Sequence, residues 1–430
     1  MRRLSALARV WVDQRLLLRR RRDRVGACME RYLLKDDIWW TGAIDWNVRD
    51  FHGYETLRGT TYNAYLILDE KVALVDGCRE GFGPEVLARV RGCCGLRPVD
   101  YLIINHVEPD HSGAIPWLVE QLSPERVFCS KRARDVLAVY YGGATVDGWN
   151  IQVVATGDEV SLGRNTLQFI EAPMLHWPDS MFTYVKQAKT LLPNDAFGQH
   201  LATSKRFADE VDLSVVMEEA SKYYANILMP FGTQIQKMLA KIGELGLEIE
   251  AIGPSHGVIW RRTEDVARIV EAYAGWSDFQ APERVSLIYD TMWHSTEQMT
   301  MAIADGVAQE GVDCVVARLS SNPRSEVARM VLESRAFLVG SPTLNNNMFP
   351  TVGEFLTYIR GLRPRKRISG AYGSCGWAGG AVKQIDAELR TLGLDMMEPI
   401  EVKYRPSEDQ LAACVELGRQ VAGKVKTAGE

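Results

Sequence analysis

The chain has 430 residues, 46% hydrophobic and 24% charged, which excludes a disordered or fibrous protein and allows two or three domains. No run of 18 apolar residues occurs, so the sequence predicts a protein that does not enter a membrane. The formal net charge is −5, and a mildly acidic chain lacks the positive field that attracts nucleic acid.

Residues 1–28 form a basic segment, in which nine arginines against Asp13 and Asp23 give +7 and leave −12 for the rest of the chain. A block of like charges stays solvated, so we expect a disordered arm or a segment that is not part of the native protein. Contact with RNA or lipid and targeting to an organelle are the alternatives. Arginines interrupt its apolar runs, which argues against a secretory signal.

Eight cysteines are scattered along the chain, and none forms a C-x-x-C pair. This spacing argues against a zinc ribbon, a rubredoxin-type iron site or a thioredoxin motif. We therefore expect reduced thiols and a cytoplasmic protein.

The first half of the chain, residues 29–278, consists of short β-rich runs separated by helical patterns. Two of these runs, 65–68 and 72–76, are separated by three polar residues, which is typical of a β-hairpin. Strands that first alternate with hairpins and then with helices indicate an αββα sandwich. The other predicted strands are 101–105, 127–130, 151–154, 167–170, 181–184, 190–193 and 249–253. The helical patterns include 84–90 and 216–245.

The second half, residues 279–430, changes to strict alternation of strands and helices. This alternation predicts a doubly wound parallel sheet. The predicted strands are 285–289, 314–319, 336–340 and 367–372. Helices are expected after the first three strands, for example at 296–310 and 325–333. The predicted linker between the halves is 272–282.

The segment 105–113 begins at the end of the predicted strand 101–105 and contains the motif H-x-E-x-D-H. Its four metal-capable side chains are His106, Glu108, Asp110 and His111. Three further metal-capable residues follow other predicted strands: His176, Asp195 and His256. Four imidazoles and three carboxylates without a thiolate favour iron or manganese over a sulfur-rich zinc site. Seven ligands suffice for two metal ions if one carboxylate bridges them.

Three loops in the second half follow predicted strands and are rich in small and hydroxyl-bearing residues. The first, 290–296, precedes a helix, where hydroxyls and backbone N–H groups form a cradle for phosphate. It contains no G-x-G-x-x-G, which disfavours a dinucleotide. The other two, 341–347 and 372–380, lie where doubly wound sheets bind ligands. Taken alone, the first loop is also consistent with an ordinary helix cap.

The metal-capable motif, together with H-W-P-D-S at 176–180, N-D-A-F-G at 194–198 and G-P-S-H-G at 253–257, resembles the pattern of the flavodiiron proteins (A-type flavoproteins). The resemblance runs from about residue 29 to the end. It implies a metallo-β-lactamase-like domain with two iron ions, fused to a flavodoxin-like domain with FMN. It also implies one iron ion on His106, Glu108 and His176 and the other on Asp110, His111 and His256. Asp195 is expected to bridge the two.

The three loops of the second half resemble the FMN-binding segments of the same family. Trp377 is expected to cover the flavin ring. Cys375 stands at a position that is often aromatic in relatives, and we expect either a buried small residue or a thiol that shifts the flavin potential. The predicted FMN-binding residues are Thr291, Met292, Trp293, His294, Ser295, Thr296, Ser341, Pro342, Thr343, Leu344, Asn345, Asn346, Ser374, Cys375, Gly376 and Trp377.

Two further histidines fall outside these sets. His52 lies in R-D-F-H-G-Y at 49–54, which resembles a family loop over the metal pocket. It is predicted either to donate a proton to bound oxygen or to have only a structural role. His200 belongs to no motif and is expected at the surface.

The resemblance implies an oxidoreductase that reduces dioxygen to water, nitric oxide to nitrous oxide, or both. Electrons are expected to pass through FMN from an external donor such as rubredoxin or a reduced deazaflavin. The flavin and the irons are expected in different domains, and the resemblance implies a head-to-tail homodimer that brings them together, with a tetramer as the larger alternative. The competing hypotheses are a zinc hydrolase with an accessory flavodoxin domain and a non-catalytic flavin electron carrier. Glu108 and the second half argue against the hydrolase, and the complete ligand set argues against the carrier.

Overall fold

The computed structural model of the chain describes residues 30–428, which form two compact units. The N-terminal unit contains the described segments 30–48, 58–216 and 243–269. The C-terminal unit contains the described segments 49–57, 217–242 and 270–428. The predicted basic arm at 1–28 lies outside the described residues. The predicted division of the sequence at residue 278 stays a prediction.

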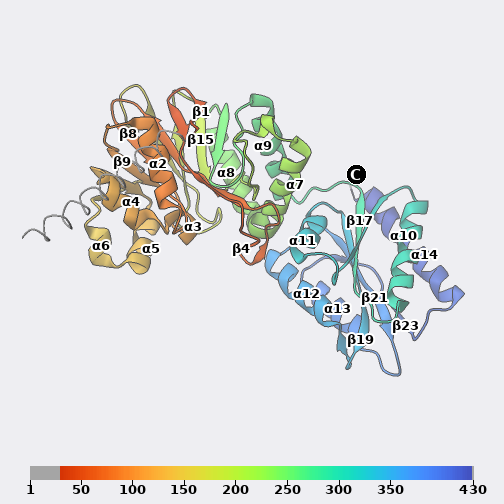
Figure 1. The fold of residues 1–430 in the computed structure, drawn as a ribbon. Helices are drawn as coiled ribbons and strands as arrows, with labels where there is room; N and C mark the ends of the chain where they lie inside the picture. Colours follow the sequence, from red (N-terminus) through yellow and green to blue (C-terminus); the bar gives the residue numbers. More distant parts are fainter. Residues whose placement is uncertain (1–29, 429–430) are drawn as a thin grey trace, which may run out of the picture. The chain divides into compact units, whose positions relative to one another are not determined.

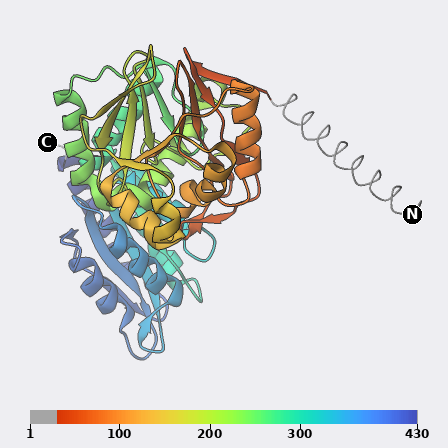
Figure 2. The same ribbon diagram turned by 90° about the vertical axis from the view of Figure 1, so that its left-hand side faces the viewer.

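Two β-sheets face each other in the N-terminal unit (Figures 1 and 2). The first has the order β1 (Tyr32–Lys35), β2 (Ile38–Trp40), β7 (Tyr65–Leu68), β8 (Val72–Val75), β9 (Tyr101–Ile104), β10 (Arg126–Cys129) and β11 (Ile151–Val153). The second has the order β12 (Glu159–Ser161), β13 (Thr166–Glu171), β14 (Met181–Val185), β15 (Thr190–Asn194) and β16 (Ala251–Pro254). The strands from β8 to β11 run parallel, as do β15 and β16.

Apolar side chains from both sheets meet in one core between them. Ile67 and Ile103 of the first sheet and Phe169 and Leu192 of the second are fully buried in this cluster. The connections between the parallel strands are helical: α2 (Gly83–Cys94), α4 (Ile115–Leu122), α5 (Lys131–Tyr141) and α6 (Gly143–Asp147). The predicted αββα sandwich is confirmed. A separate pair of strands, β3 (Ala43–Asp45) and β6 (Thr60–Tyr62), lies outside the two sheets.

The predicted helix at 216–245 is not continuous. It consists of α7 (Leu213–Tyr223), a π-helical turn η2 (Tyr224–Leu228), a 3-10 turn η3 (Met229–Phe231) and α8 (Gly232–Glu244). Pro230 lacks the N–H that an uninterrupted α-helix needs, which explains the break. The predicted linker at 272–282 is also partly wrong, because α9 (Thr263–Ser277) continues into it. Tyr273 is buried there, with its ring 5.2 Å from that of Tyr224.

The C-terminal unit is a parallel sheet with the order β18-β17-β19-β21, followed by β22 and β23 beside different parts of β21. The strands are β17 (Arg284–Tyr289), β18 (Asp313–Arg318), β19 (Ala336–Leu344), β21 (Ile368–Cys375), β22 (Asp395–Met396) and β23 (Ile400–Lys403). This order is that of a doubly wound sheet whose direction of growth reverses between β17 and β19. The sequence did not predict β23. The predicted loop 341–347 is partly strand, because β19 continues to Leu344 and pairs with β20 (Asn347–Met348).

Helices cover both faces of this sheet (Figure 1). The two helices α10 (Ser295–Gln309) and α14 (Glu408–Thr427) pack on one face, where Gly306 and Gly418 lie at their crossing. The other face carries α11 (Arg324–Leu332), α12 (Pro350–Leu362) and α13 (Ala381–Arg390). The unit also contains a short hairpin of β4 (Asp50–Phe51) and β5 (Tyr54–Glu55). Within residues 30–428, no helix combines the length and hydropathy that a bilayer crossing requires.

Candidate metal centre and cofactor cavity

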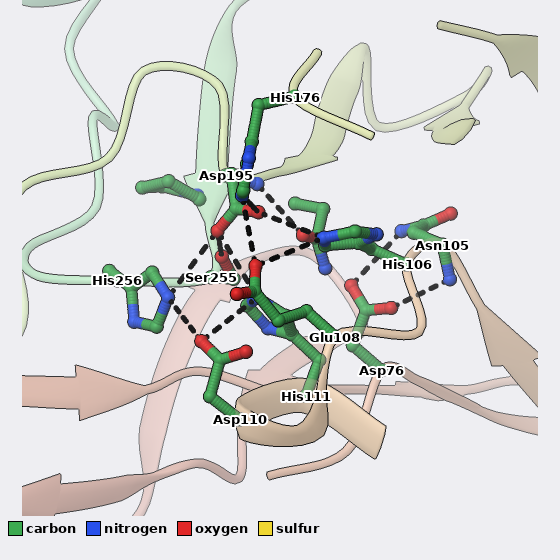
Figure 3. Close-up of polar contacts among 12 residues, drawn as sticks. Asp76, Asn105, His106, Glu108, Asp110, His111, His176, Asp195, Ser255 and His256 are labelled. Atoms are coloured by element: carbon green, nitrogen blue, oxygen red, sulfur yellow. Dashed lines mark hydrogen bonds and ion pairs between the residues drawn. The ribbon is translucent and has the colours of Figure 1, made fainter. Parts of the chain in front are cut away.

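The seven metal-capable side chains predicted from the sequence converge in the N-terminal unit (Figure 3). Four come from the segment after β9, and the others follow β13, β15 and β16. The predicted loop after β9 contains one helical turn, α3 (Pro109–Ser112), which presents Asp110 and His111. Pro109 is the first residue of this turn, where its fixed φ starts a helix and its missing N–H costs nothing.

One group of ligand-type atoms surrounds the Oδ2 atom of Asp195. His176 Nε2 lies 3.0 Å from Glu108 Oε2 and 3.4 Å from Asp195 Oδ2. His106 Nε2 lies 3.5 Å from Glu108 Oε2 and 3.6 Å from Asp195 Oδ2. These four side chains therefore form a compact set with two imidazole nitrogens and two carboxylates.

A second group surrounds the other oxygen of the same carboxylate. His111 Nε2 and His256 Nε2 each lie 3.1 Å from Asp110 Oδ2. Their distances to Asp195 Oδ1 are 3.2 and 3.3 Å. Asp195 thus offers one oxygen to each group, which is the arrangement of a bridging carboxylate.

The separations between these atoms fit the coordination sphere of a metal ion. Two ligand atoms that lie about 2.1 Å from one ion, at angles of roughly 90–110°, are about 3.0–3.4 Å apart. His106 Nε2, His111 Nε2 and Asp195 Oδ2 are buried and make no hydrogen bond within the described residues. Buried polar atoms without a hydrogen bond call for another partner, and nitrogen and oxygen donors of this kind suit an iron ion.

Carboxylates control the protonation of the histidines at this site. Burial by itself lowers the pKa of His176, but Asp195 and Glu108 raise it to about 9. Burial also lowers the pKa of His256, and Asp110 and Asp195 raise it to about 10. Burial raises the pKa of Asp195, yet the surrounding histidines, His111 foremost, hold it well below its usual range. The carboxylates therefore attract cations, either protons or metal ions.

In two of the histidines, Nδ1 contacts an oxygen on the side of the ring that faces away from the site. His106 Nδ1 lies 2.8 Å from Asp179 Oδ2, and His256 Nδ1 lies 2.6 Å from the carbonyl oxygen of Thr61. A proton on Nδ1 leaves Nε2 as the nitrogen that faces the site. Gly257 is needed beside His256, because a Cβ there would lie 1.4 Å from Gln199 Oε1 and the φ angle is +79°.

His52 and His200 are not among these seven residues. His52 lies at the turn between β4 and β5, a hairpin of the C-terminal unit, and its predicted role stays a prediction. The expectation that His200 lies at the surface is wrong, since it is only 2% exposed. Its Nδ1 is 2.7 Å from Thr60 Oγ1, and its ring centre is 4.9 Å from that of His256. The signal that sequence reasoning missed is its closeness to Asp195, five residues earlier.

The C-terminal unit has a cavity of about 840 Å³ at the carboxyl ends of its strands. All predicted FMN-binding residues line it except Thr296 and Ser341. Thr296 Oγ1 lies 3.1 Å from Ser374 Oγ, while Ser341 Oγ accepts a hydrogen bond from the backbone N–H of Phe349 at 2.9 Å. These two hydroxyls therefore support the loops instead of forming the cavity wall.

Four lining residues were not predicted: Gln298, Ala378, Tyr404 and Arg405. Tyr404 and Arg405 directly follow β23, the strand that was also missed. The apolar and charged residues of Ile400–Lys403 alternate, which is the period of a half-buried strand. This alternation is the signal for the strand, but over four residues it is too short to distinguish a strand from a loop.

One end of the cavity is shaped for a phosphate group. The helix α10 begins there at Ser295, and its free N–H groups attract anions. Thr291 Oγ1 is buried and makes no hydrogen bond within the described part of the chain. The backbone N–H of Thr291 donates to Asp290 Oδ1 at 2.9 Å, which fixes the loop. A phosphate monoester fits this combination of hydroxyl and N–H donors without a cation.

The rest of the cavity is suited to a flat ring system. Trp293 and Trp377 line it while 86% and 87% exposed. Gly380 lets two of the loops approach, because a Cβ there would lie 2.4 Å from the carbonyl oxygen of Asn346. Cys375 also lines the cavity, and burial raises the pKa of its thiol. It is therefore a neutral thiol near neutral pH.

Both units match known family models. Residues 60–257 match the model described as ODP family beta lactamase, and residues 287–418 match the flavodoxin model. A relative from Moorella thermoacetica named nitric oxide reductase is 48% identical over 396 residues, which are 91% of this chain and 98% of the relative. A relative from Methanothermobacter marburgensis named coenzyme F₄₂₀H₂ oxidase is 42% identical over 402 residues, with 91% and 98% covered.

Solved structures resemble this one over nearly the whole chain. The rubredoxin oxygen:oxidoreductase from Desulfovibrio gigas has a TM-score of 0.89 at 36% identity, with 93% of this chain and 99% of that chain covered. The flavodiiron protein from Giardia intestinalis has the same TM-score at 34% identity, with 93% and 98% covered. The likeness therefore extends over both units.

Proposed function

The chain belongs to the flavodiiron proteins, oxidoreductases that use FMN and two iron ions to reduce dioxygen, nitric oxide or both, and from that premise we propose which of its residues carry the reaction. The fold, the cofactors and the class of reaction are those expected from the sequence.

We assign the two iron ions to the two groups of side chains described above. His106, Glu108 and His176 hold the first ion, and Asp110, His111 and His256 hold the second. Asp195 bridges them. The observation that carries this assignment is the bridging carboxylate, whose Oδ2 faces one group at 3.4 and 3.6 Å and whose Oδ1 faces the other at 3.2 and 3.3 Å.

We assign FMN to the cavity of the C-terminal unit. The loop from Thr291 to the start of α10 would hold its phosphate, and the loops after β19 and β21 would hold its ring. The buried hydroxyl of Thr291 and the exposed rings of Trp293 and Trp377 support this orientation. Arg405 adds one positive charge to the cavity wall.

When bound, the flavin turns electron pairs into single electrons, and the iron pair binds the gas. The chain's own residues hold these groups and keep them dry. Burial of His106 and Asp195 excludes bulk water from the bridging position. His52 is our candidate for proton delivery to the reduced gas, a role that rests on the family resemblance of its loop.

The electron donor and the assembly are the finer parts of the proposal. Relatives named coenzyme F₄₂₀H₂ oxidase and rubredoxin oxygen:oxidoreductase favour a reduced deazaflavin or rubredoxin as the donor. We propose a head-to-tail homodimer, or a tetramer made of two such dimers. Two large aromatic side chains with more than 80% exposure at the cavity mouth, Trp293 and Trp377, support a partner that covers them.

We place the reaction in the cytoplasm. The seven cysteines within the described residues are all free, which favours a reducing compartment.

Turnover with both gases tests the proposal. Full-length protein loaded with iron and FMN is reduced without oxygen and then supplied with dioxygen or nitric oxide in parallel, with iron and FMN quantified on the same sample. We expect consumption of at least one gas in proportion to the iron content, and the ratio of rates ranks the two substrates. A zinc-loaded sample with full FMN content is the control and is expected to be inactive.

Two results would favour the alternatives. Hydrolysis of a thioester or a lactam by the zinc-loaded sample would support the hydrolase, whose chemistry is that of metal-bound hydroxide. Reversible flavin reduction without turnover of either gas, at full iron content, would support an electron carrier.

A further inference from the structure

We propose that Asp179 is a positioning residue that makes the iron position of His106 the tighter of the two. The inference rests on the proposed ligand assignment, and it adds an order of affinity that the assignment does not contain.

Asp179 is built into the protein behind the metal centre. It is 1% exposed, and its Oδ2 lies 2.8 Å from His106 Nδ1. The same oxygen accepts a hydrogen bond from the backbone N–H of Val107 at 3.0 Å. The backbone carbonyl of Asp179 in turn accepts from Ser130 Oγ at 2.8 Å. The carboxylate is therefore fixed, and through it both the imidazole and the backbone of the metal-capable motif are fixed.

A carboxylate changes the imidazole that it holds. The carboxylate keeps the imidazole proton on Nδ1, so that Nε2 faces the metal. Its negative charge also makes Nε2 a stronger ligand for the metal. The pair of Asp179 and His106 is buried, so water does not screen this effect. Both effects, the fixed proton and the negative charge, strengthen iron binding at the position that includes His106.

The imidazoles of the second position have different partners. His256 Nδ1 is held by the carbonyl oxygen of Thr61 at 2.6 Å, and a carbonyl group carries no net charge. A buried carboxylate also lies near the second position, because the charges of Asp76 and His111 interact. The two oxygens of Asp76 accept their hydrogen bonds from the backbone N–H and the side-chain amide of Asn105, at 2.8 and 3.1 Å (Figure 3). The hydrogen-bonded partners therefore differ: a carboxylate holds Nδ1 of His106 and a carbonyl oxygen holds Nδ1 of His256, while Asp76 acts on His111 through its charge.

The substitution Asp179→Asn separates charge from shape. The amide oxygen of asparagine can still accept from Val107 N, whereas the negative charge is lost. Metal-free, full-length protein is titrated anaerobically with ferrous iron, and the two dissociation constants are measured together with Mössbauer spectra of the bound ⁵⁷Fe. We expect one of the two sites to bind about 10–100-fold more weakly, with the other unchanged.

The affected site is identified in two single-site backgrounds. In the His256→Ala background only the iron site that contains His106 is intact, and Asp179→Asn is expected to weaken iron binding at that site. In the His176→Ala background only the iron site of Asp110, His111 and His256 is intact, and Asp179→Asn is expected to have no effect on iron binding there. Asp158→Asn is the matched control, because the exposed Asp158 also accepts from a backbone N–H, that of Ala155 at 2.8 Å, but lies at no ligand.

The outcomes distinguish this inference from the proposed function. Equal weakening of both sites, or no weakening, in a variant that folds and keeps its FMN would overturn the role of Asp179. A wild-type protein that binds fewer than two iron ions would overturn the ligand assignment itself. If Asp179→Asn does not fold, the two single-site variants still decide, because the inference requires His256→Ala to retain iron more tightly than His176→Ala.

Discussion

At the scale of single residues, the position of one short carboxylate determines how the metal centre is organised. Asp195 follows β15 directly, and Ser255 Oγ donates to its Oδ1 at 3.0 Å. The short side chain and this contact fix the direction of both oxygens. One side chain at the end of a buried strand can therefore serve two groups of ligands.

The raised pKa values of the histidines predict that iron loading depends on pH. In the metal-free protein His176 and His256, with pKa values of about 9 and 10, carry protons at pH 7. Iron must displace these protons, so its apparent affinity is expected to rise as the pH increases from 6.5 toward 9. Ferrous titrations in weakly buffered solution measure both the affinity and the released protons. Equal affinity at pH 6.5 and 8.5, without proton release, would contradict this account.

The buried hydroxyl of Thr291 predicts a specific loss of FMN affinity. Thr291→Val keeps the shape of the side chain but removes a hydrogen bond to a charged phosphate, worth about 1.5–3 kcal/mol. We expect FMN to bind at least about tenfold more weakly, as measured by quenching of its fluorescence on titration with flavin-free protein. Thr391→Val is the control, because that exposed hydroxyl donates only to the carbonyl oxygen of Glu388. Equal affinity for both variants would remove Thr291 from the phosphate site.

At the scale of elements, the sequence predicted those strands whose apolar runs are long enough to be distinctive. The strand after which His106 stands, β9, is such a run, and so is β17 before the phosphate loop. The four-residue strand β23 carries two charged residues, so its pattern is too short to separate from a loop. The break within 216–245 follows from Pro230, but the choice of a π-helical turn depends on contacts that a helical period does not encode.

The crossing of α10 and α14 predicts opposite effects of two similar substitutions in one helix. A Cβ at Gly418 would lie 2.1 Å from the carbonyl oxygen of Ile303, whereas a Cβ at Gly423 meets nothing within 4 Å. Gly418→Ala should therefore lower the free energy of unfolding of the C-terminal unit by about 1–3 kcal/mol. Gly423→Ala should raise it by up to about 1 kcal/mol, because alanine favours a helix.

Denaturant unfolding followed by flavin fluorescence and circular dichroism measures both changes. A Gly418→Ala protein as stable as the wild type would show that the two helices can separate at little cost.

At the scale of the whole molecule, the sequence predicted two halves but not that two segments of the first half belong to the C-terminal unit. The segment 217–242 belongs to the C-terminal unit, where Lys222 Nζ lies 2.5 Å from Glu326 Oε1 and Asn226 receives a hydrogen bond from Tyr358 at 2.6 Å. Each contact joins residues more than a hundred positions apart in the sequence. A single sequence shows no sign of such pairs, because each partner alone resembles an ordinary polar residue of a helix.

A head-to-tail dimer predicts that two inactive variants restore each other. His176→Ala removes an iron ligand, and Thr291→Asp places a negative charge in the phosphate site, so neither homodimer is expected to turn over. Random mixing makes half of the dimers mixed, each with one complete centre, and about a quarter of the wild-type activity should return. The rate of gas consumption, measured before and after mixing, gives the recovery of activity.

The control for this experiment mixes His176→Ala with His256→Ala, which damage the same centre and should restore nothing. If mixed dimers of the first pair form but stay inactive, electrons pass within one subunit and the head-to-tail arrangement is wrong.

The interleaving of segments 49–57 and 217–242 with the C-terminal unit also limits how this protein can be divided. A gene cut at residue 278 would produce a first fragment that carries two segments of the C-terminal unit, including the fully buried Tyr224. The second fragment would lack the same pieces and would show apolar surface to water. We therefore expect the two fragments to fold when they are expressed together, and not when either one is expressed alone.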